Sequence, residues 1–173
     1  MRQIQVKTLQ TILVFIICLV KQQEVLANKT EIQDLKTSIN IESSLKTVIG
    51  GSYRKHLKIL MQLKKNLQNE GIVVLSPVGE LALNPKEEFV LLDADPVHDP
   101  RILQDSIFAK IRTASFHVVA NVGGYIGSAA KLEMGYAIAN GLQILTIEPV
   151  DDPNLAPYCR LITEVFPNVL SDI

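Results

Sequence analysis

A single carboxylate, Glu133, stands in the stretch of this chain whose residues are best suited to chemistry. Residues 116–120 form a continuous apolar run, residues 121–128 a glycine-rich turn, and the residues that follow surround Glu133 with small and apolar neighbours. A strand that ends beside a helix N-terminus is where open α/β sheets bind ligands, because free backbone N–H groups point at the crevice. A carboxylate there can act as a nucleophile or stabilise a developing cation. The alternative is an ordinary solvated helix glutamate.

A second carboxylate, Asp105, follows Asp99 and Pro100, which form a helix start with an acidic N-cap and proline at the first helical position. As a purely structural residue, Asp105 would interact favourably with the helix dipole. As a functional residue, it would be a general acid beside Glu133. Cleavage of a glycosidic bond needs such a pair, because one carboxylate traps or stabilises the sugar cation while the other protonates the leaving group.

Two glycine-containing turns flank these carboxylates, at residues 50–54 and at residues 121–128. Each can simply reverse the chain. Each can also bind an anion or a hydroxyl through backbone N–H groups, with the Arg54 guanidinium adding charge in the first turn. Neither contains a dinucleotide fingerprint or a Walker lysine. The substrate-binding candidates in the two turns are Gly51, Ser52, Tyr53, Arg54, Asn121, Gly127 and Ser128.

Short apolar runs alternate with amphipathic stretches from residue 47 onward. Strands are predicted at residues 47–49, 72–75, 116–120 and 142–147. Helices are predicted over residues 53–69, from residue 100, and from the second glycine turn to residues 140–141. Residues 80–95 are irregular, with a short strand or helix expected near residues 89–92. The strands are continuously apolar, which indicates burial on both faces and a parallel sheet. We therefore predict a three-layer, doubly wound α/β domain, flavodoxin- or Rossmann-like, with four or five strands. By analogy with flavodoxin-like sheets, the strand order is expected to be 2-1-3-4.

The composition describes a compact protein without a nucleic-acid polymer as partner. The chain has 173 residues, is 47% hydrophobic, carries a formal net charge of −1 and lacks tryptophan, so it offers neither a basic surface nor an aromatic base-stacking platform. Cys18 and Cys159 lack metal-ligand spacing, and His117, inside a predicted strand, is expected in the core.

Residues 1–46 are predicted to be an apolar segment and polar linker, ahead of a domain at residues 47–173. A basic start, an uncharged run at residues 11–20 and the small residue Ala27 have the layout of a secretory signal. The alternative is a helix that packs its apolar side on the domain or on another subunit. The run is shorter than the about 20 residues needed to span a bilayer. Membrane contact is therefore expected only if this run is retained, and export or tethering only if residues 1–27 act as a signal.

The motifs resemble those of the nucleoside 2-deoxyribosyltransferase family and the related 2'-deoxynucleoside 5'-phosphate N-hydrolases. The resemblance covers about residues 48–148 and rests on three segments. Residues 51–54 are similar to a Gly-Ser-x-Arg turn, and residues 127–141 to a Gly-x-x-x-Glu-x-Gly-x-Ala block. Asp105 looks like the family's aspartate that handles the base. The transferases carry acidic residues in the loop where this chain has Asn121, which would substitute there as a hydrogen-bonding group.

The resemblance implies that Glu133 attacks C1' of a deoxyribose, that Asp105 protonates the departing base, and that a covalent glycosyl-enzyme passes the sugar to another base or to water. It implies a nucleoside or nucleotide substrate, no metal or cofactor, a homo-oligomer and a cytoplasmic location. Two alternatives stay open. One is hydrolysis of a 2'-deoxynucleoside 5'-phosphate, since Arg54 and Ser128 suit a phosphate. The other is a nucleotide-binding module without catalysis.

Overall fold

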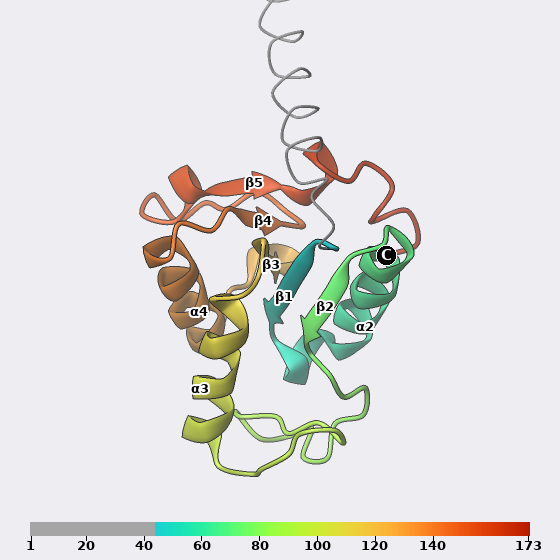
Figure 1. Cartoon of the computed structure of the whole chain (residues 1–173), viewed down its shortest axis with the longest axis vertical. Coiled ribbons are helices and arrows are strands. Elements are labelled where there is room, and N and C mark those ends of the chain that lie inside the picture. Colours follow the sequence, from blue (N-terminus) through green and yellow to red (C-terminus); the bar gives the residue numbers. More distant parts are fainter. Residues whose placement is uncertain (1–43) are drawn as a thin grey trace, which may run out of the picture. The chain divides into compact units, whose positions relative to one another are not determined.

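The computed structural model describes residues 44–173, and the predicted signal or packing helix lies outside them. These residues form a five-stranded, fully parallel sheet in the order β2-β1-β3-β4-β5 (Figure 1). The predicted fold class and the order 2-1-3-4 are thus confirmed, and a fifth strand extends the sheet beyond β4. The strands are β1 (Lys46–Gly51), β2 (Val73–Ser76), β3 (Phe116–Ala120), β4 (Ile144–Thr146) and β5 (Cys159–Leu161).

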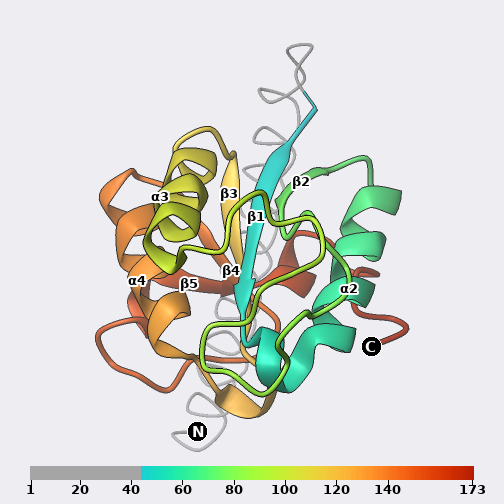
Figure 2. The same cartoon turned by 90° about the horizontal axis from the view of Figure 1, so that it is seen from below.

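Helices cover both faces of the sheet (Figures 1 and 2). Helix α2 (Tyr53–Asn69) packs on one face, and α3 (Pro100–Ile111) and α4 (Ser128–Ala139) pack on the other. None of the helices described for residues 44–173 is both long and apolar enough to cross a bilayer. Three single turns of 3₁₀-helix complete the structure: η1 (Val122–Gly124), η2 (Ala156–Tyr158) and η3 (Ile162–Glu164).

Each central strand contributes side chains to two separate cores. In β1, Val48 packs in the core beneath α3 and α4, whereas Ile49 packs in the core beneath α2 and the C-terminal segment. This alternation follows from the pleat, which sends successive side chains to opposite faces of a sheet. Phe116 of β3 lies against Phe166 of the C-terminal segment, with ring centroids 5.7 Å apart. Burial on both faces explains why the strands read as unbroken apolar runs.

Polar side chains cap the N-termini of two helices, α2 and α3. The Ser52 hydroxyl accepts the Lys55 N–H at 3.3 Å and caps α2 directly after β1. The Asp99 carboxylate accepts the Ile102 N–H at 2.9 Å and caps α3. Such caps satisfy N–H groups that have no partner inside the helix. The Ser52 cap begins α2 directly beside the end of β1, where the predicted crevice lies.

The segment from residue 77 to residue 99, here named the 77–99 loop, departs from expectation. Neither a regular strand nor a helix forms near residues 89–92; a single antiparallel bridge joins Ala82 to Leu92. The Asp93 carboxylate holds the fold of the loop by accepting the N–H groups of Glu80 and Leu81, and these hydrogen bonds lower its pKa. These side-chain hydrogen bonds add to a few backbone hydrogen bonds within the loop, such as the one from the Leu83 N–H to the Leu91 carbonyl.

Candidate functional site

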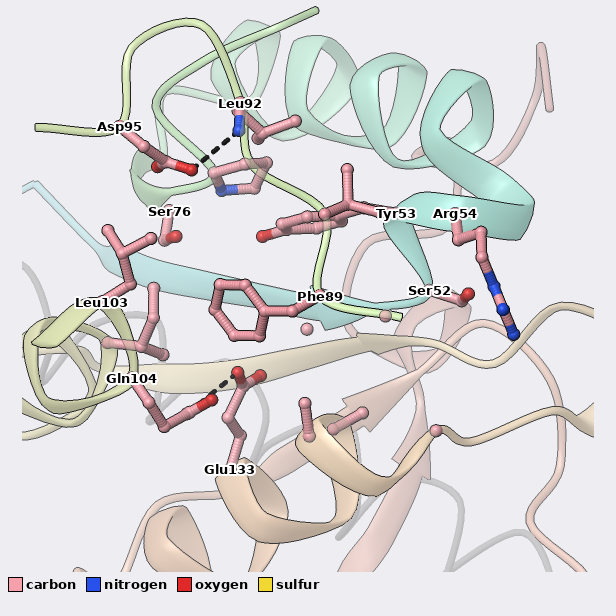
Figure 3. Close-up of a pocket in the computed structure, with 18 of the residues that line it drawn as sticks. Ser52, Tyr53, Arg54, Ser76, Phe89, Leu92, Asp95, Leu103, Gln104 and Glu133 are labelled. Carbon is pink, nitrogen blue, oxygen red and sulfur yellow. Dashed lines mark hydrogen bonds between the residues drawn. The ribbon is translucent and has the colours of Figure 1, made fainter. Parts of the chain in front are cut away.

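A cavity of about 460 Å³ opens at the carboxyl ends of β1 and β2. Its walls come from the start of α2, the inner faces of α3 and α4, and the 77–99 loop (Figure 3). This is the edge at which doubly wound sheets bind ligands. The volume lies within the range of about 300–1,000 Å³ that is typical of small-molecule sites.

Glu133 lies in the wall of this cavity, on the side of α4 that faces α3. Its side chain is 9% exposed, and its Oε1 accepts a hydrogen bond from Gln104 Nε2 at 3.2 Å. Burial raises the pKa of Glu133 to about 7, because a charged carboxylate loses hydration there, while the Gln104 hydrogen bond opposes the shift. Of the two interpretations of this residue, the structure thus excludes the solvated surface glutamate.

Gly50 gives the Glu133 carboxyl its space. A Cβ atom added at this glycine would lie 2.7 Å from Glu133 Oε2 and 3.3 Å from the ring atoms Cε1 and Nε2 of His117. His117 is fully buried, as predicted, and neither ring nitrogen has a hydrogen-bond partner among the described residues. Burial lowers the pKa of His117 to about 4, and the nearby Val48 carbonyl opposes this only in part. A neutral imidazole and the Glu133 carboxyl therefore both lie close to Gly50.

Asp105 does not reach the cavity. Its side chain is 66% exposed and lies 4.0 Å from Arg101 on the solvent side of α3. Successive helix residues differ by about 100° in direction, so Gln104 faces Glu133 while Asp105 faces water. The expectation that two carboxylates meet across a sugar is not met by Asp105.

The first glycine turn does line the cavity, through Gly51, Ser52, Tyr53 and Arg54. The Tyr53 hydroxyl points toward Ser76 (Figure 3). Burial raises the pKa of this hydroxyl, the Glu133 charge adds to the effect, the Ser76 hydroxyl opposes it, and the charge on Asp95 adds a little more. The phenol therefore stays protonated at neutral pH and can donate a hydrogen bond.

Arg54 has a partner within the chain. Its Nη1 lies 2.8 Å from Glu88 Oε1, and Glu88 belongs to the 77–99 loop. The Glu88 side chain is 86% exposed, so the pair is well solvated and contributes little to stability. The Arg54 guanidinium thus borders the cavity with one carboxylate already beside it.

In the second glycine turn, some residues line the cavity and others only hold the strands together. Gly127 and Ser128 line the cavity at the start of α4. Asn121 does not: it is fully buried, donates from Nδ2 to the Glu148 carbonyl at 2.9 Å, and accepts the Glu148 N–H at 3.0 Å. The Glu148 carboxylate in turn accepts the N–H groups of Gly123 and Gly124. Asn121, predicted to bind substrate, is thus not part of the cavity wall, and its amide joins the segments that follow β3 and β4.

The cavity residues that were not identified from the sequence include Gln104, Phe89, Asp95 and Lys110. The sequence does hold a signal for Gln104 and Lys110: their positions in the helical repeat lie near the apolar face of α3 that Leu103 and Ile107 define. The sequence holds no such signal for Phe89 and Asp95, because the 77–99 loop has no hydrophobic periodicity. In Figure 3, Phe89 lies between Tyr53 and Glu133. Within residues 44–173, no three His, Cys, Asp or Glu side chains gather closely enough to hold a metal ion.

Comparisons with known proteins find little. No protein-family model matches the sequence, and no curated protein matches it. Among solved structures, the chain is similar to the CMP N-glycosidase BcmB of Clostridium botulinum, with 12% identity and a TM-score of 0.41. That likeness covers 73% of this chain and 80% of the glycosidase.

Proposed function

We propose that this protein acts on the N-glycosidic bond of a deoxynucleoside, with Glu133 as the nucleophile. It either cleaves that bond with water or transfers the deoxyribose to a second base. The observation that carries the proposal is a buried carboxyl, held by Gln104 in a cavity of about 460 Å³ at the ligand-binding edge of a parallel sheet. The similarity of residues 127–141 to the transferase block supports the same residue in the same role.

In the proposed reaction, Glu133 attacks C1' of the sugar and forms an ester, while the bond from C1' to the base nitrogen breaks. The electron pair of that bond passes to the base, which takes up a proton from water or from a cavity donor. Water or a second base then attacks C1' of the ester, loses its proton to solvent, and releases the Glu133 carboxylate as the bond from C1' to the carboxyl oxygen breaks. Two displacements at C1' retain the configuration, as in retaining glycosidases.

A pKa near 7 suits this role at neutral pH. About half of the Glu133 carboxyls are then ionised, and a desolvated carboxylate facing a developing sugar cation interacts more strongly than one in water. Gln104 holds one oxygen, Oε1, which restricts the orientation of the carboxyl. Positioning of this kind lowers the entropic part of the barrier.

The test is release of free base from deoxynucleosides and deoxynucleoside 5'-monophosphates by the full chain, with and without an acceptor base. Two matched amide variants sharpen it. Glu133→Gln should abolish release, whereas Asp105→Asn, on the exposed side of α3, should leave it unchanged. Intact-mass detection of a deoxyribosyl adduct on the wild type but not on Glu133→Gln would support the covalent step. Continued release by Glu133→Gln would refute the mechanism.

One observation favours a second candidate, hydrolysis of a 5'-phosphorylated deoxynucleoside. Arg54, Ser52 and Ser128 border the cavity together, and Ser128 begins α4, whose N-terminus favours an anion. Arg54→Gln should then raise KM for the monophosphate about tenfold or more and leave KM for the nucleoside unchanged. Tight binding of nucleotide without release of any base would instead support a module without catalysis.

A further inference from the structure

His117 is a buried ionisable side chain to which the proposed reaction gives no role. It lies in β3 and is fully buried. A neutral imidazole carries one N–H that donates and one bare nitrogen that accepts, yet neither nitrogen has a hydrogen-bond partner among the described residues. Most buried polar groups in proteins are hydrogen-bonded. Two unpartnered nitrogens are therefore an exception that packing of the core alone does not explain.

Strand pairing directs the His117 ring toward Gly50. His117 lies opposite Val48, and Gly50 is two residues further along β1, on the same face of the sheet, which α3 and α4 cover. A Cβ atom added at Gly50 would lie 3.3 Å from His117 Nε2 and 2.7 Å from Glu133 Oε2. These two atoms thus border one point, and they are no further apart than the two distances together.

The Glu133 carboxyl has one oxygen held and one oxygen free to accept. Oε1 accepts from Gln104 Nε2 at 3.2 Å, whereas no donor within residues 44–173 is hydrogen-bonded to Oε2. The other ionisable side chains in the cavity wall are Tyr53 and Arg54 of α2, Glu88 and Asp95 of the 77–99 loop, Lys110 of α3, and Tyr125. In the part of the chain that the structure describes, none of them is hydrogen-bonded or ion-paired to Glu133. The nitrogen beside Gly50 matches the free oxygen.

An imidazole nitrogen suits the carboxyl in the state that attacks. A hydrogen bond to a carboxylate is about twice as strong as one between neutral groups, so an N–H next to Oε2 favours ionised Glu133. Burial has the opposite effect and raises the pKa of Glu133 to about 7. Hydrogen bonds of catalytic groups are often long without substrate and tighten only in the complex. The present separation of the two atoms is compatible with such a contact.

We propose that His117 is a positioning residue for the nucleophile: its Nε2–H donates to Oε2 of ionised Glu133, while Gln104 donates to Oε1. The inference rests on the proposed function for the role of Glu133. His117 is not part of the cavity wall, so it acts through Glu133 and does not touch the substrate. The missing side chain at Gly50 leaves the space in which the two groups meet.

The kinetic test uses two substitutions at His117 and a matched control. His117→Phe keeps a ring but has no donor. It should lower kcat for base release about 10- to 100-fold, with KM unchanged, and raise the midpoint of the pH profile by about one unit. His117→Gln carries an amide that can donate and should restore most of kcat. His98→Phe, exposed and outside the cavity wall, should match the wild type. Equal kcat in His117→Phe and the wild type, or equal losses in both His117 variants, would overturn the inference.

Magnetic resonance of the ring nitrogens requires no turnover and separates failure of this inference from failure of the proposed function. In the full chain with nitrogen-15-labelled histidine, the His117 signals are those missing from His117→Phe. This ring stays neutral at neutral and alkaline pH, because burial lowers its pKa to about 4.

We expect the His117 Nε2 signal of the wild type to shift with a midpoint near pH 7, as Glu133 ionises, and to stay constant in Glu133→Gln. This result would support the inference even if the wild type releases no base. A wild-type signal that is constant from pH ~5 to pH ~9, or that shifts equally in Glu133→Gln, would overturn it even if the protein is an active glycosidase.

Discussion

Replacing Glu133 with glutamine should remove activity and make the folded protein more stable at neutral and alkaline pH. The carboxyl is almost wholly buried, and burial raises its pKa from 4.5 to about 7. Glutamine has nearly the same shape, keeps an oxygen that accepts from Gln104 Nε2, and never ionises. The variant thus removes the cost of a buried charge without leaving a cavity.

The magnitude follows from proton linkage. Below pH 4.5 the Glu133 carboxyl is neutral in both the folded and the unfolded chain, so ionisation does not affect stability. As pH rises through about 7, the unfolded chain has already lost this proton, and the folded chain must carry a buried charge. Each tenfold difference in acid dissociation constant corresponds to about 1.4 kcal/mol. Glu133→Gln should therefore exceed the wild type in unfolding free energy by about 1 kcal/mol at pH ~5 and by about 3 kcal/mol at pH ~8.

Urea unfolding of both proteins across this pH range measures the difference. His117 contributes in the opposite direction: burial lowers its pKa to about 4, so it costs stability as pH falls from 6.5 through about 4. Because His117 is present in both proteins, subtraction removes its contribution. A difference that does not change with pH, or a variant that is less stable at pH ~8, would show that Glu133 is not a desolvated carboxyl, and the reasoning about its reactivity would fail with it.

Three further outcomes are expected. Base release should rise as pH increases through about 7, because only ionised Glu133 attacks; a rate profile that is level from pH ~5 to pH ~9 would contradict this assignment. Gly50→Ala should lower kcat by about 100-fold with unchanged circular dichroism, since its Cβ would lie 2.7 Å from Glu133 Oε2, whereas Gly135→Ala, with open space around the site, should be as active as the wild type. Asn121→Ala should lower the unfolding free energy by about 2–3 kcal/mol in urea titrations, because Glu148 loses partners for its partly buried N–H and carbonyl; a loss below about 0.5 kcal/mol would contradict the joining role.

Several features of the site were predictable because they depend on nearby residues. The continuous apolar runs predicted a parallel sheet buried on both faces, and doubly wound topology then placed the turns after β1 and β3 at one edge. Glu133 follows one of those turns within a helix of apolar neighbours, so its position in a sheltered cavity could be expected. Gly127 and Ser128 line the cavity for the same reason.

Other features depended on distances that no local pattern encodes. Gln104 and Asp105 are adjacent in the chain, and only the rotation of α3 about its axis decided which of them faces Glu133. The partner of Asn121 is Glu148, 27 residues further along, so its structural role appeared only when β4 lay beside β3.

Hydrophobic periodicity and turn residues thus predicted the layers and the edge of the sheet at which the cavity opens, since those follow from burial of apolar surface, whereas the strand order was predicted by analogy with flavodoxin-like sheets. Tertiary structure alone decided which polar side chains meet there. It brought Glu133 and His117 close to Gly50, and it brought Asp95 and Lys110 to the same cavity from the 77–99 loop and α3. The physical reason is that burial and electrostatic interaction depend on proximity in space, and a loop without periodicity carries no local sign of what it will lie against.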